Sequence, residues 1–150
     1  MHKRLSSKHE IKMKSPIKIQ ATIKATPEKI WEAYTQAEHI VHWNFASPDW
    51  HCPSAEVDLK AGGQYKARME AKDGSFGFDF LAVFDEVIPY SQIHYTLGDG
   101  RKVKTRIEPQ NDLTKVETLF EPESENPRDL QEQGWQAILN NFKNYVESIS

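Results

Sequence analysis

Residues 126–150 read NPRDLQEQGWQAILNNFKNYVESIS, and this stretch decides the fold class. Asn126 is a favourable N-cap and Pro127 suits the first helical position, so we expect a helix of about 20 residues to begin here. A helix with a broad apolar stripe must cover another layer, which predicts a sheet upstream in the chain. The stripe consists of Leu130, Trp135, Ile138, Leu139, Phe142, Val146 and Ile149.

The middle of the chain carries the alternating apolar and polar pattern that is typical of half-buried strands. Turn sequences such as Asp73-Gly74 separate neighbouring runs by hairpin spacing, which predicts an antiparallel sheet. The alternating runs occupy residues 17–23, 64–71, 76–84, 93–97, 103–107 and 116–120.

Two short helices are predicted after the first strand. Thr26-Pro27-Glu28 supplies a cap, a first helical residue and a favourable negative charge, and residues 37–43 suggest a second helical piece. Two prolines then predict an irregular loop over residues 44–53. The element order predicts an α+β fold, in which a curved antiparallel sheet of about six strands wraps around the long C-terminal helix.

The composition limits the class of protein. The 150 residues fit one domain, and the four Trp, five Tyr and seven Phe are far more than a disordered chain would carry. No apolar run is long enough to span a membrane, and the basic N-terminus lacks the apolar stretch of a secretory signal. Cys52 is the single cysteine, which excludes an internal disulfide. We therefore expect a protein of the cytoplasm.

The charge is distributed unevenly along the chain. Residues 1–18 carry six Lys or Arg and one Glu, whereas the formal net charge of the whole chain is −3. The acidic body is a poor partner for nucleic acid. We expect residues 1–15 to form a basic, disordered tail and residues 16–150 to form the single folded domain.

A group of histidine and cysteine residues could in principle bind a metal ion. His39 and His42 lie three residues apart on a predicted helix, and His51 and Cys52 follow in the predicted loop. Adjacent ligands fit poorly around one ion, and no paired ligand motif supports the idea. A Cys–His nucleophile is equally unsupported, because no orienting residue is recognisable. We expect no metal, no cofactor and no assigned catalytic residue.

Several segments together resemble a known family. They are residues 25–31 (ATPEKIW), residues 58–65 (DLKAGGQY), residues 84–89 (FDEVIP) and the pair Gly134-Trp135. In their order and spacing, the chain resembles the activator of heat-shock-protein-90 ATPase homologue-like proteins of the START-like (SRPBCC) superfamily. The resemblance implies a helix-grip fold with a hydrophobic cavity between the sheet and the long helix, and it does not imply one function.

Three functions follow as alternatives. The first is binding of an unidentified hydrophobic or lipid-like small molecule in that cavity, with residues 44–53 opening and closing its mouth. The second is a protein-partner module, chaperone-regulator-like or homodimeric. The third is a cyclase- or hydratase-type enzyme, for which Tyr65, Tyr95, Thr105 and Thr118 are the inward hydroxyls. The candidate ligand-binding residues are Trp43, Phe45, Trp50, Tyr65, Phe78, Phe80, Tyr95, Trp135 and Leu139.

Overall fold

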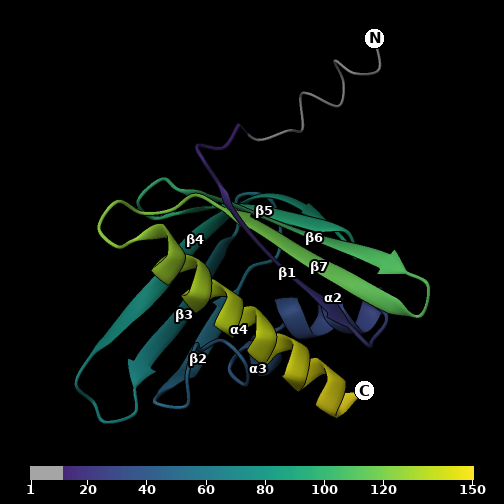
Figure 1. The fold of residues 1–150 in the computed structure, drawn as a ribbon, viewed down its shortest axis with the longest axis horizontal. Coiled ribbons are helices and arrows are strands. Elements are labelled where there is room, and N and C mark those ends of the chain that lie inside the picture. The colour runs from purple at the N-terminus through teal and green to yellow at the C-terminus, as the bar shows by residue number, and fades with distance from the viewer. Residues whose placement is uncertain (1–11) are drawn as a thin grey trace.

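The computed structural model describes residues 12–150, which form a curled sheet with one long helix across its concave side (Figure 1). All strand pairs are antiparallel, in the order β1-β7-β6-β5-β4-β3-β2. The elements are β1 (Ile17–Ile23), α2 (Pro27–Thr35), α3 (Ala37–Ile40), β2 (Trp50–Val57), β3 (Gln64–Ala71), β4 (Gly77–Ile88), β5 (Gln92–Leu97), β6 (Lys102–Gln110), β7 (Leu113–Phe120) and α4 (Arg128–Ile149).

The predicted fold class is confirmed: an α+β fold with the long helix at the C-terminus and short helices after the first strand. The described residues form seven strands, one more than the sequence pattern suggested. The additional strand is β2, which begins at Trp50 inside the stretch expected to be an irregular loop. Pro53 is tolerated there because β2 lies at the edge of the sheet and its register shifts between His51 and Ser54.

The ends of the helices differ in detail from the prediction. Thr26 caps α2 as expected, because its Oγ1 accepts a hydrogen bond from the Lys29 backbone N at 3.2 Å. Asn126 does not cap α4, because its amide donates instead to Glu123 Oε2 at 2.6 Å. The helix α3 stops at Ile40, three residues before the predicted end.

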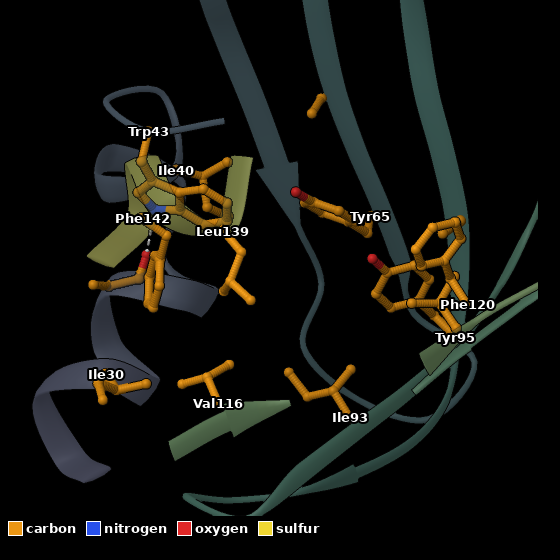
Figure 2. Packing of buried hydrophobic residues seen from close by; sticks show 14 of the residues in the cluster. Ile30, Ile40, Trp43, Tyr65, Ile93, Tyr95, Val116, Phe120, Leu139 and Phe142 are labelled. Carbon is orange, nitrogen blue, oxygen red and sulfur yellow. Dashed lines mark hydrogen bonds between the residues drawn. The ribbon is translucent and has the colours of Figure 1, made fainter. Parts of the chain in front are cut away.

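The core lies between the concave face of the sheet and α4 (Figure 2). Phe142 on α4 is fully buried and meets Trp43 edge-on, with 4.8 Å between the ring centroids. Asn141 Nδ2 donates to the Trp43 carbonyl at 3.0 Å, so that α4 also holds the segment after α3 in place. On the sheet side, Val116 and Phe120 of β7 are fully buried.

The start of the described chain is attached to the sheet and to α4. The Lys14 backbone N donates to Glu121 Oε2 at 2.6 Å, and Arg128 Nη1 donates to the Ser15 carbonyl at 2.7 Å. Most of the predicted basic tail, residues 1–11, lies outside the described residues. Among residues 12–150, no helix has both the length and the apolar character that crossing a membrane requires.

Candidate functional site: a cavity between the sheet and the C-terminal helix

A cavity of about 310 Å³ lies between the sheet and α4. Its position follows from the way α4 packs, because the helix contacts β1 rather than the β3–β4 hairpin, which projects past it (Figure 1). The strands β3 and β4 therefore form a wall that faces α4 across the cavity. Because α4 stands away from β3 and β4, the space between them is not filled by core side chains. If the helix packed directly on these strands, the core would be continuous there.

Most of the cavity wall is apolar. Phe80 on β4 and Trp135 on α4 approach each other from opposite walls, with ring centroids 6.4 Å apart. Trp135 also stacks on Phe120 at 4.1 Å, which fixes the orientation of the indole. Met69, Ile93, Ile138 and Leu139 complete much of the apolar surface. Such a wall favours an apolar guest, because contact with it removes apolar surface from water.

The inner wall also carries hydroxyl groups. Tyr34 Oη shares a hydrogen bond with Thr105 Oγ1 at 3.1 Å, and Thr105 shares a second with Thr118 Oγ1 at 2.9 Å. Tyr95 lies on the same cavity wall as Tyr34. Tyr65 is held separately, since its oxygen accepts from Asn44 Nδ2 at 3.5 Å. The cavity thus has a polar inner region without ionised groups.

The tyrosine hydroxyls on this wall stay protonated at neutral pH. Burial raises the pKa of Tyr34, of Tyr65 and of Tyr95 above the usual value for a phenol, because the phenolate would lose its hydration. For Tyr65 and Tyr95, the mutual repulsion of neighbouring phenolates raises the pKa further. Each phenol is therefore a neutral hydrogen-bonding group.

Charged residues of the cavity lie together at one rim. Arg101 Nε donates to Asp99 Oδ2 at 2.8 Å, and Arg101 Nη1 reaches the Glu121 carbonyl at 3.5 Å. Glu123 accepts from the Asn126 backbone N at 2.7 Å, and this hydrogen bonding lowers the pKa of its carboxyl. Gln131 Nε2 donates to the Glu123 carbonyl at 3.0 Å. The charges at this rim are mainly engaged with their own loops.

A cluster of exposed and half-buried aromatic side chains continues the apolar wall beyond the cavity. Phe78 lines the cavity and is still 42% exposed, and Phe76 at the hairpin is 62% exposed. Trp50 on β2 contacts both rings, with centroid distances of 6.1 Å and 6.0 Å. These three rings extend the apolar strip of β4 toward the end of the β3–β4 hairpin.

The structure brings most of the candidate residues together. Seven of the nine line the cavity: Trp43, Tyr65, Phe78, Phe80, Tyr95, Trp135 and Leu139. Phe45 does not line it, and its carbonyl accepts from Asn141 at 3.4 Å. Trp50 lies outside on β2 with the cluster of aromatic side chains. The irregular loop expected over residues 44–53 is wrong for residues 50–53, which belong to β2.

Sequence reasoning missed several wall residues. Tyr34 is absent from the candidate residues, yet it lines the cavity and its hydroxyl shares a hydrogen bond with Thr105. Asn44 was placed in a loop with no role, whereas it is buried beside Tyr65. The only available signal for Tyr34 was its position three residues after Trp31, on the same helix face. Arg101 and Glu123 could not be found from the sequence, since they lie outside helices and strands, and the polar Gln131 of α4 is not part of the apolar stripe.

The histidine and cysteine group is dispersed. His39 Nδ1 shares a hydrogen bond with Tyr145 Oη at 2.6 Å, and the His42 ring stacks on the same tyrosine. His51 Nε2 lies 3.7 Å from Glu70, and the buried Cys52 thiol donates to the Ser54 carbonyl. Over residues 12–150, no group of three or more His, Cys, Asp and Glu residues is arranged to hold a metal ion.

The fold and the cavity define a START-like, helix-grip domain, and comparison with known proteins identifies the family. The model of the family "Activator of Hsp90 ATPase homolog 1-like protein" matches residues 24–147. The chain belongs to this family, and the resemblance noted in the sequence is confirmed. No curated protein matches the sequence.

Solved structures agree with this assignment. An AHSA1-like protein from Aeromonas hydrophila is 38% identical, with a TM-score of 0.82 over 89% of this chain and 94% of that chain. A protein from Cytophaga hutchinsonii is 48% identical, with a TM-score of 0.78 over 89% and 92% of the two chains. The Aha1 dimer from Colwellia psychrerythraea is 18% identical, with a TM-score of 0.68 over 89% and 97%, and this likeness shows the fold alone.

Proposed function

We propose that this protein binds a hydrophobic or lipid-like small molecule in the cavity between the sheet and α4. The observation that carries the proposal is the cavity of about 310 Å³, with its largely apolar and aromatic wall. A guest that buries its apolar surface there gains roughly 25 cal/mol per Å², before the cost of ordering is subtracted. The exposed rings of Phe76 and Phe78, with the half-buried Trp50 beside them, give such a guest an apolar path to the cavity.

The two alternatives have weaker support. An enzyme would need an acid or base inside, but among the described wall residues the ionised groups are Arg101 and Glu123 at the rim. A homodimer stays a prediction, supported by the dimeric Colwellia relative and by Leu81 and Val83, which are exposed on β4. A cytoplasmic location also stays a prediction.

Filling the cavity should abolish binding. Ile138 lines the cavity from α4, so Ile138→Trp places an indole where the guest would lie. We expect the affinity for the neutral apolar dye N-phenyl-1-naphthylamine to fall by at least about tenfold, which is a loss of about 1.4 kcal/mol. The measurement is a titration that follows the rise in dye fluorescence on transfer to an apolar site.

Leu130→Trp is the matched control, because Leu130 lies on the same helix and is 55% exposed. It should bind the dye as the unsubstituted protein does, and thermal unfolding of both variants shows that each is folded. Unchanged binding by a folded Ile138→Trp protein would contradict the proposal, as would a failure of the unsubstituted protein to bind the dye.

A further inference from the structure

The inner wall of the cavity distinguishes between kinds of apolar guest. Tyr65 and Tyr95 lie on adjacent parts of this wall, with ring centroids 5.9 Å apart. Figure 2 shows both phenol oxygens on the side of their rings that faces Leu139 and Phe142. A guest between the sheet and α4 would therefore meet two hydroxyl groups as well as hydrocarbon.

The Tyr65 hydroxyl is arranged as a donor. Its oxygen accepts the hydrogen bond from Asn44 Nδ2, so that bond does not use the phenol proton. Burial raises the pKa of Tyr65, which keeps the proton on the oxygen at neutral pH. Tyr95 shares the cavity wall with Tyr34 and Thr118, whose hydroxyls are linked through Thr105 and whose protons can rotate to suit a guest.

From this geometry, and on the basis of the proposed function, we infer that the ligand is a neutral apolar molecule with one hydrogen-bond-accepting oxygen, such as a ketone carbonyl. Tyr65 donates to that oxygen, Tyr95 adjoins it, and the apolar body of the ligand extends along Phe80 toward Phe78. Recognition of this kind favours a carbonyl compound over the corresponding hydrocarbon.

A carboxylate fits the same place poorly. Burying an ionised group costs far more than burying a carbonyl unless a positive charge accompanies it. Arg101 is the cationic residue of the described cavity wall, and its guanidinium already pairs with Asp99 at the rim. The inner hydroxyls are neutral, so they cannot compensate a full negative charge. The site should therefore discriminate against anionic analogues of its ligand.

Three related probes represent the three kinds of ligand. Naphthalene is the hydrocarbon, 2-acetylnaphthalene is the ketone, and 2-naphthoate, which is ionised at pH 7.5, is the carboxylate. We expect 2-acetylnaphthalene to bind at least about tenfold more tightly than 2-naphthoate. In Tyr65→Phe, the affinity for 2-acetylnaphthalene should fall by about three- to tenfold, the usual effect of one lost hydrogen bond. The affinity for naphthalene should stay within about twofold, because that probe makes no hydrogen bond to the tyrosine.

Tyr145→Phe is the matched control, since it removes a phenol hydroxyl that bonds to His39 outside the cavity. It should leave all three affinities unchanged. If Tyr65→Phe does not fold, Tyr95→Phe takes its place with the same expected selectivity. Equal losses for naphthalene and the ketone, or equal binding of ketone and carboxylate, would overturn the inference and leave the proposed function standing. Failure of all three probes to bind would overturn both.

Discussion

Replacing Phe142 with alanine should lower the free energy of unfolding by about 3–5 kcal/mol, the range for deleting a large buried ring. Phe142 is fully buried at the junction of α4, α2 and the segment that follows α3. Its ring meets Tyr34 at 5.4 Å and Trp43 at 4.8 Å between centroids, both edge-on. Alanine would leave a void that these two rigid rings cannot fill.

The measurement is urea unfolding followed by circular dichroism. Leu130→Ala on the same helix is the control, because Leu130 is largely exposed and its loss should change stability by less than about 0.5 kcal/mol. A destabilisation of less than about 1.5 kcal/mol for Phe142→Ala would contradict tight packing of Phe142 between Tyr34 and Trp43.

Replacing Gly63 with alanine should lower the free energy of unfolding by about 2–4 kcal/mol, as severe backbone clashes do. A methyl group at Gly63 would clash with the Asp58 carbonyl oxygen, so the turn between β2 and β3 must move. The turn is also tied to β4, since the Phe84 backbone N donates to the Gly63 carbonyl at 2.9 Å. Phe84 lines the cavity, so the distortion should reach the site.

Gly134→Ala is the matched control, because nothing lies within 4 Å of the added methyl group in α4. It should raise the free energy of unfolding by up to about 1 kcal/mol, since alanine favours a helix. Thermal melts of the two variants would give shifts of opposite sign. If both variants raised the melting temperature, the Asp58 carbonyl could not lie as close to Gly63 in solution as the structure shows.

Much of the fold could be predicted because local patterns and tertiary packing agree. The apolar stripe of α4, the alternation in β3, and the cap at Thr26 each satisfy both local preference and burial. Prediction failed where tertiary context decides the local structure. The strand β2 forms despite Pro53, because β3 offers it a partner and the proline lies at the sheet edge.

The candidate site could be predicted in part for a similar reason. Phe80, Tyr65 and Tyr95 lie on the inward faces of strands, which the alternation reveals. The exposure of Phe76 and Phe78 could not be inferred, because the same alternation continues past the point where α4 ceases to cover β4. Arg101 and Glu123 line the same cavity although they lie in separate connecting segments, and a periodic pattern carries no information about that.

His94 illustrates a buried group that the sequence did not reveal. The alternation of β5 assigns it to the outward face, yet it is only 2% exposed. Its Nδ1 lies 3.5 Å from Glu86 Oε1, while Nε2 has no hydrogen-bond partner among the described residues. Burial lowers the pKa of His94, against the opposing influence of Glu86. The imidazole is therefore neutral at neutral pH.

The central claim is that an apolar molecule binds between the sheet and α4, and nuclear magnetic resonance tests it most directly. The protein would carry ¹³C-labelled Ile, Leu and Met methyl groups, and naphthalene would be added. We predict intermolecular nuclear Overhauser effects from the probe to the methyl groups of Met69, Ile93 and Leu139, which line the cavity. Effects confined to the exposed methyl groups of Leu113, Leu130 and Ile149 would contradict the claim.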